Sequence, residues 1–183
     1  MRNLSLTLIQ SPLYWQDTVA NLAMFEEKMW ALDGHHDIVL LPEMFSPGFS
    51  MNPEKLAEPM GLTTFRWMKL QAERMGSVVA GSFIVKEAGH YFNRFIWMRP
   101  DGTYEKYDKR HLFRMAKEQE VYSPGQDRLI VEFEGWRICP LICYDLRFPV
   151  WSRNQYNQSS EKLEFDLLLY VANWPAPRHE AWV

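Results

Sequence analysis

WRICPLICYD, residues 136–145, is a mostly apolar run that ends in a cysteine followed by two polar residues. The apolar part predicts a buried strand, and residues 146–151 predict the start of a helix. Cys143 would then lie at the carboxyl end of a strand and beside a helix amino terminus. In α/β proteins ligands bind at such positions, and the helix dipole there lowers the pKa of a thiol. Cys143 is therefore our candidate nucleophile.

The composition favours one globular domain. The chain has 183 residues, of which 47% are apolar and 15% aromatic, and this is enough for a packed core. A formal net charge of -3 argues against a nucleic-acid partner, because such a surface needs a basic face. The sequence has no signal-peptide pattern and no apolar run near the roughly 20 residues that span a bilayer. We expect a cytoplasmic protein with no membrane partner.

The two cysteines, Cys139 and Cys143, are expected to stay unpaired. Four residues apart on one strand, they would have Cα atoms roughly 13 Å apart. That separation exceeds the reach of a disulfide, and free thiols fit a reducing compartment.

The first half of the chain predicts a β-α-β-α-β order, with strands at residues 3–9, 37–43 and 77–85. The strand at 3–9 would place on one face Leu4, Leu6 and Leu8. The first helix is expected to begin at Asp17 or Thr18 and to bury Val19, Leu22, Phe25, Met29 and Leu32. The second is expected to begin at Thr63 or Thr64 and to bury Phe65, Met68, Ala72 and Met75.

The second half predicts further strands. Two hairpins are expected, one joining residues 91–99 to 103–107 and one joining 129–133 to 137–143, and a last strand covers 165–172. No repeat, low-complexity segment or linker divides the chain, so residues 1–183 are expected to form one domain.

Three reactive side chains follow predicted strands, namely Glu43, Lys109 and Cys143. A wound sheet brings such strand ends to one rim. An ammonium would stabilise the thiolate of Cys143, and Glu43 would take the thiol proton, pass it to a leaving amine and then activate water. Lys109 and the backbone N–H of Tyr144 would stabilise the oxyanion that forms when a carbonyl is attacked. The set therefore predicts cleavage of a small amide.

Each of these residues also has an ordinary structural explanation. A buried cysteine is most often a packing residue, and Cys139 keeps that interpretation. Glu43 and Lys109 fit equally well as charges on a solvated face. Spacing alone does not decide between the two explanations.

Two further function classes stay open. A cysteine hydrolase would use His111 or His179 as the base for Cys143, and a non-enzymatic chain would be a binding or interaction domain that has lost activity. The five histidines show no ligand spacing, so no metal site is expected.

Three ordered segments, LLPEMF (40–45), YDKRHLF (107–113) and LICYDLRF (141–148), resemble the signature segments of the nitrilase superfamily. The resemblance covers essentially the whole chain. It implies that Glu43 is the general base, Lys109 the oxyanion-stabilising lysine and Cys143 the nucleophile, with no cofactor. It also implies an α/β fold, the four-layer α-β-β-α sandwich of the nitrilase type.

The superfamily tends to carry a second carboxylate shortly before a Pro-Gly turn. Glu118 matches it best, five residues before Ser123, and Glu120 is the alternative. This carboxylate would keep Lys109 charged and position it or the substrate.

KRHLFRMA (109–116), WRICPLIC (136–143) and NWPAPR (173–178) resemble the omega-amidase branch. This implies hydrolysis of the terminal amide of 2-oxo dicarboxylic monoamides, such as 2-oxoglutaramate, through a cysteine thioester. Another superfamily amidase or a nitrilase is the alternative. An anionic substrate needs a further cation, for which guanidinium suits best. The candidate substrate-binding residues are Arg110, Arg114 and Arg178, together with Tyr144, Asn173 and Trp174.

Members of the superfamily usually continue past the Asn-Trp-Pro segment, whereas this chain stops at Val183. We therefore expect a catalytic domain truncated at its C-terminus. The missing part normally contributes to the pocket wall and to dimerisation, so the resemblance implies a homodimer and, for this chain alone, exposed apolar surface.

Overall fold

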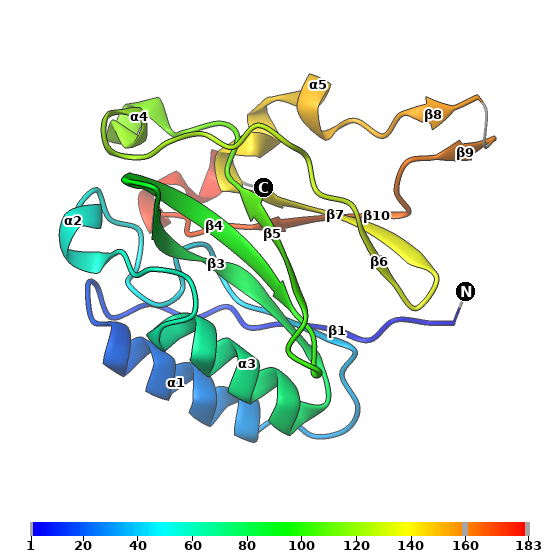
Figure 1. The fold of residues 1–183 in the computed structure, drawn as a ribbon, viewed down its shortest axis with the longest axis horizontal. Coiled ribbons are helices and arrows are strands. Elements are labelled where there is room, and N and C mark those ends of the chain that lie inside the picture. The colour runs from blue at the N-terminus through cyan, green and yellow to red at the C-terminus, as the bar shows by residue number, and fades with distance from the viewer. Residues whose placement is uncertain (1, 159–160, 182–183) are drawn as a thin grey trace.

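A computed structural model describes residues 2–158 and 161–181 of the chain. Its centre is two β-sheets that pack face to face (Figure 1). The larger sheet has the order β1 (Leu6–Leu8), β2 (Ile38–Leu40), β3 (Val78–Glu87), β4 (His90–Met98) and β5 (Tyr104–Asp108). The first three strands are parallel and the last two are added antiparallel. The predicted β-α-β-α-β order and the first hairpin are therefore confirmed.

The smaller sheet has the order β10 (Leu167–Val171), β7 (Trp136–Ile142) and β6 (Val131–Phe133). β10 is parallel to β7, and β6 forms the predicted hairpin with β7. The short strands β8 (Tyr156–Asn157) and β9 (Lys162–Leu163) pair separately. Side chains from both sheets form one core between them, including Trp97 from β4 and Leu141 from β7, both fully buried. This core fixes the carboxyl end of β7 against the larger sheet.

Helices α1 (Thr18–Trp30) and α3 (Thr63–Met75) lie side by side on the outer face of the larger sheet (Figure 1). The Asp17 side chain caps α1 by accepting a 2.9 Å hydrogen bond from Ala20 N, as predicted. Gly76 ends α3 in the left-handed conformation with φ of 61°. Phe25 and Met68 are fully buried against the sheet, so the helices form the first layer of the predicted sandwich.

Two predicted core positions are wrong. Val19 is 77% exposed. At 100° per residue it lies roughly 100° from the centre of the buried stripe of α1, and Asn21 is buried on that face instead. Leu8 is 72% exposed, although it follows Leu4 and Leu6 on the same strand face. It lines a groove beside residues 170–176 rather than the core between the sheets.

The remaining helices are short. They are α2 (Pro53–Leu56), α4 (Glu118–Val121), α5 (Pro149–Ser152) and the 3₁₀ helices η1 (Arg114–Ala116), η2 (Cys143–Arg147) and η3 (Ala176–Ala181). The helix predicted for residues 146–151 is therefore wrong in its bounds. A 3₁₀ turn begins at Cys143 itself and ends at Arg147, because Pro149 disfavours helical geometry in Phe148, the residue before it.

Gly125 packs against the chain at the end of β5. An added Cβ would lie 2.1 Å from the Asp108 carbonyl oxygen, and the Gly125 N–H donates to the Lys109 carbonyl oxygen at 3.0 Å. Only glycine allows this close approach, which holds residues 108 and 109 in place.

We predict that Gly125→Ala lowers the free energy of unfolding by about 2 kcal/mol or more, since the backbone must shift to remove the clash. Gly34→Ala is the matched control, because Gly34 has φ of +90° but no atom within 4 Å of the added Cβ. It should cost only about 1 kcal/mol, the strain of its backbone. Urea unfolding of both variants measures the difference, and equal losses would contradict the prediction.

Candidate active site

The structure brings together the three side chains predicted to act together. Glu43 follows β2, Lys109 follows β5 and Cys143 follows β7. Lys109 Nζ donates to Glu43 Oε1 at 2.8 Å, and Glu43 is close enough to the Cys143 thiol for its charge to raise the pKa of that thiol. The two sheets therefore contribute to one site, with the acid and the lysine on the larger sheet and the thiol on the smaller.

Glu43 is fixed by contacts on several sides. The next residue, Met44, has φ of 45°, and its N–H donates to Ser82 Oγ at 2.9 Å, which anchors the turn to β3. Asn93 Nδ2 donates to Glu43 Oε1 at 2.8 Å, and Asn173 N donates to Oε2 at 3.0 Å. With no exposed surface and these donors in place, the carboxylate has little freedom to rotate.

Lys109 is shared between two carboxylates. Its Nζ lies 2.9 Å from Glu118 Oε2 in addition to the Glu43 contact, and all three side chains are at most 1% exposed. Burial opposes the charged ammonium, but the charges of Glu43 and Glu118 raise the pKa of Lys109 above its usual value. Burial raises the pKa of Glu118, and the charge of Glu43 adds to this while Lys109 opposes it. Glu120 is exposed near Lys117 instead, so Glu118 is the one beside the lysine.

The Cys143 backbone has φ of 43°, a left-handed conformation that is rare outside glycine. Its side chain is 8% exposed. Burial raises the pKa of the thiol, as does the charge of Glu43, and Lys109 only partly offsets this. The expectation of a thiol pKa lowered by a helix dipole is therefore wrong, because η2 is one short 3₁₀ turn while the site is buried and acidic. At rest the thiol is protonated and needs a base.

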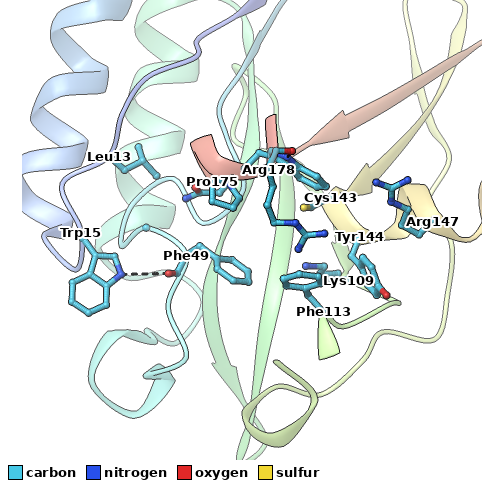
Figure 2. Close-up of a pocket in the computed structure, with 13 residues that line it drawn as sticks. Leu13, Trp15, Phe49, Lys109, Phe113, Cys143, Tyr144, Arg147, Pro175 and Arg178 are labelled. Carbon is cyan, nitrogen blue, oxygen red and sulfur yellow. Dashed lines mark hydrogen bonds between the residues drawn. The ribbon is translucent and has the colours of Figure 1, made fainter. Parts of the chain in front are cut away.

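A pocket of about 320 Å³ opens above Cys143 (Figure 2). Its wall is mostly apolar but includes basic side chains, and it consists of Leu13, Trp15, Gly48, Phe49, Lys109, Phe113, Cys143, Tyr144, Arg147, Asn173, Trp174, Pro175 and Arg178. The predicted substrate residues Tyr144, Asn173, Trp174 and Arg178 all belong to it.

The three candidate arginines lie in different places. Figure 2 shows the Arg178 side chain extending into the pocket, where its guanidinium carbon is 5.2 Å from the centre of the Phe113 ring. Arg110 donates to Gly125 O and Gln126 Oε1 and lies outside the pocket wall. Arg114 is exposed on η1 and also lies outside it. Neither of these two lines the pocket, whereas Arg147, which the sequence did not single out, does.

His111, one of the two histidines considered as a base, makes its described contacts with other residues. His111 Nδ1 lies 2.8 Å from Asp145 Oδ1, and its ring stacks on Phe148 with centroids 3.7 Å apart. The side chain of His179 lies outside the described residues. Among the described residues, Glu43 is a carboxylate that interacts with the Cys143 thiol, whereas His111 pairs with Asp145.

Two buried residues of the site were missed. Asn93 bridges Glu43 and Glu118 through its amide nitrogen, and Asp145 accepts from residues on both sides of Lys109. Asn93 is a polar residue among apolar neighbours in β4, and Asp145 lies two residues after the candidate nucleophile. Both signals were present in the sequence, but neither identifies its partners.

The described part of the chain has no cluster of three or more His, Cys, Asp or Glu side chains placed to hold a metal ion. Within residues 2–158 and 161–181, each helix is too short or too polar to cross a membrane.

Comparison with known proteins places the chain among hydrolases. Residues 5–169 match the carbon-nitrogen hydrolase family. The chain is 46% identical to the omega-amidase YafV of Yersinia enterocolitica, over all of this chain and 68% of the relative. It is 32% identical to the 2-oxoglutaramate amidase of Bacillus subtilis, over 81% of this chain and 56% of the relative.

A solved structure has the same fold. XC1258 of Xanthomonas campestris, a CN-hydrolase superfamily protein with an arsenic adduct in its active site, is 43% identical. It superimposes with a TM-score of 0.95 over all of this chain and 69% of its own length. The predicted nitrilase-type α/β fold is thereby confirmed.

We predict that Glu43→Gln lowers the pKa of the Cys143 thiol, because it removes a negative charge that raises this pKa and leaves Lys109 in place. Thiolate absorbance in the ultraviolet, measured against pH with Cys143→Ala as baseline, should then appear at lower pH than in the wild type. Glu120→Gln, which alters an exposed carboxylate, should leave the titration unchanged. An unshifted curve in Glu43→Gln would show that the carboxylate does not control the thiol.

Proposed function

The chain belongs to the carbon-nitrogen hydrolase family, and on that basis we propose that it is an omega-amidase. It hydrolyses the terminal amide of 2-oxo dicarboxylic monoamides such as 2-oxoglutaramate and releases ammonia and the 2-oxo acid. The observation that carries the proposal is the buried contact of Glu43, Lys109 and Cys143 at the base of a pocket that also holds an arginine. Relatives named omega-amidase and 2-oxoglutaramate amidase support the substrate class.

The first half-reaction forms a thioester. As Cys143 Sγ attacks the amide carbon, Glu43 takes the thiol proton, since this carboxylate lies beside the thiol and interacts with it electrostatically. The oxyanion forms beside Lys109 Nζ, and the backbone N–H of Tyr144 is the second donor. Glu43 then gives its proton to the amide nitrogen, the C–N bond breaks and ammonia leaves.

The second half-reaction releases the acid. Glu43 removes a proton from water and the water oxygen attacks the thioester carbon. The C–S bond then breaks, and Glu43 returns the proton to the departing sulfur, which restores the thiol and the carboxylate. Glu118 touches no reacting atom in this scheme. It keeps Lys109 charged and fixed, because it accepts from Nζ through both oxygens at 3.2 and 2.9 Å.

Arg178 is the proposed partner of the substrate carboxylate. Its guanidinium lies over the rings of Phe113 and Trp174, with centroid distances of 5.2 and 5.6 Å. Such a planar cation suits two-point binding of a carboxylate. Arg147 also lines the pocket and adds positive charge to it, while Tyr144 and Trp174 give ring surface for the carbon chain.

The proposal includes the cellular form of the protein. We infer one domain over residues 1–183, a homodimer and a cytoplasmic location. The two unpaired cysteines support a reducing compartment. Light scattering that gives the mass of a single chain at working concentrations would contradict the dimer.

For the reaction, we expect ammonia release from 2-oxoglutaramate and little or none from simple amides and nitriles. Intact mass after brief incubation should show an acyl adduct that Cys143→Ala lacks. Glu43→Gln should lose nearly all turnover, because the amide can neither take the thiol proton nor return it. Strong turnover of a nitrile with none of the 2-oxo acid amides would contradict the substrate class, and full activity of Glu43→Gln would favour a histidine base.

For the specificity, Arg178→Met should raise KM for 2-oxoglutaramate about tenfold or more, since a hydrogen bond to a charged group is worth about 1.5–3 kcal/mol. The KM of a slowly hydrolysed neutral amide should change little. Arg66→Met, on the exposed face of α3, is the control for loss of one positive charge. An equal rise in KM for both substrates would show that Arg178 shapes the wall without binding the carboxylate.

A further inference from the structure

Asp145 is a buried carboxylate that the proposed reaction does not use. It has no exposed surface and accepts from four groups. Oδ1 accepts from the His111 N–H at 2.9 Å and lies 2.8 Å from His111 Nδ1. Oδ2 accepts from the Tyr107 hydroxyl at 2.7 Å and from the Ile142 N–H at 3.1 Å. Burial, together with the charge of Asp145, raises the pKa of Tyr107 and keeps this hydroxyl a donor.

These four donors belong to residues close in sequence to Lys109 and Cys143. The distance between the Lys109 ammonium and the Cys143 thiol is the one that matters most for the proposed reaction. Tyr107 and His111 stand two residues before and after Lys109, and Ile142 directly precedes Cys143. One carboxylate therefore binds the segment that carries the lysine and the turn that carries the thiol. The segments come from different sheets and are 34 residues apart at the His111–Asp145 contact.

The turn around Cys143 needs stabilising hydrogen bonds of this kind. Its φ of 43° is costly for a residue with a side chain, and η2 contains only five residues. The bond from Ile142 N to Asp145 Oδ2 closes the turn directly around Cys143. Without it, the chain has less to keep the thiol in this strained conformation.

We propose that Asp145 is a positioning residue, which fixes the Cys143 turn against the Lys109 segment and so sets the distance between the nucleophile and the oxyanion-stabilising ammonium. The inference rests on the proposed function for its kinetic consequence. Its structural consequence, the placement of the thiol, is independent of the substrate.

A carboxylate is required rather than an amide of the same shape. Each oxygen accepts from one backbone N–H, Oδ1 from His111 and Oδ2 from Ile142. A backbone N–H cannot reverse its polarity, whereas the Tyr107 hydroxyl can. An asparagine presents one NH₂ group, so whichever way it is oriented it opposes one of these two N–H donors. Asp145→Asn must therefore release one of the two segments.

The test compares Asp145→Asn with Asp166→Asn. Asp166 Oδ2 accepts from the Arg137 N–H at 3.0 Å, so it braces the opposite end of the same strand β7 without touching the site. For Asp145→Asn we expect kcat per folded molecule to fall about 100-fold, as for a displacement near 1 Å at a reacting group. KM should change less than threefold, because the pocket wall stays in place. Asp166→Asn should lose stability and keep kcat.

A second readout needs no substrate. The thiol faces Glu43, Lys109 and Glu118 and is largely buried, and burial is the main cause of its raised pKa. A loosened turn exposes the thiol, so its thiolate should appear at lower pH in Asp145→Asn and at the wild-type pH in Asp166→Asn. The titration separates the positioning role of Asp145 from the proposed omega-amidase function. If the wild type hydrolysed no 2-oxo acid amide, the proposed function would be overturned, but the titration would still test the role of Asp145.

Tyr107→Phe covers the case in which Asp145→Asn does not fold. It removes one donor and leaves both backbone bonds, so kcat per folded molecule should fall about fivefold, the value of one hydrogen bond. Wild-type kcat and an unshifted thiolate titration in Asp145→Asn would overturn the proposal. An equal loss of kcat in Asp166→Asn would overturn it as well, by showing that any bond to β7 has the same effect.

Discussion

The buried ammonium of Lys109 between Glu43 and Glu118 is the constraint on which the rest of the site depends. Burying three charged groups is costly unless each is paired and hydrogen-bonded. Here the lysine pairs with both acids, and Asn93 donates to both of them. One ammonium faces two carboxylates, and burial raises the pKa of Glu118.

The sheet order explains how this cluster is assembled. β2 and β5 belong to the larger sheet and β7 to the smaller, and the apolar core between the sheets joins them. Glu43 and Lys109 come from strands separated by β3 and β4, and it is β3 that anchors the turn after Glu43 while β4 supplies Asn93. The site is therefore built on strand ends whose positions are set by the packing of the core, and precise placement of reacting groups follows from that rigidity.

The sequence predicted most of the strands and the three reacting side chains because both are local signals, in the form of apolar runs and short motifs. It predicted less well the features that depend on which residues lie close together in the folded chain. Val19 has the right residue type but the wrong angle on α1. Arg110 and Arg178 look alike in the sequence, yet Gly125 and Gln126 bind the first while the second lies in the pocket. The prediction for the pKa of the Cys143 thiol was wrong because this pKa depends on burial and on the charge of Glu43. Glu43 lies 100 residues away in the sequence and follows a strand of the other sheet.

The protonated state of Cys143 affects how easily this thiol is oxidised. Oxidants and electrophiles react with the thiolate, so a thiol that is buried and held in its neutral form is a poor target for them. A thiol with a permanently lowered pKa would be open to sulfenic acid formation between catalytic cycles. Here burial and the charge of Glu43 favour the neutral thiol. The acidic surroundings of the nucleophile therefore act as protection against oxidative damage as well as a source of the base.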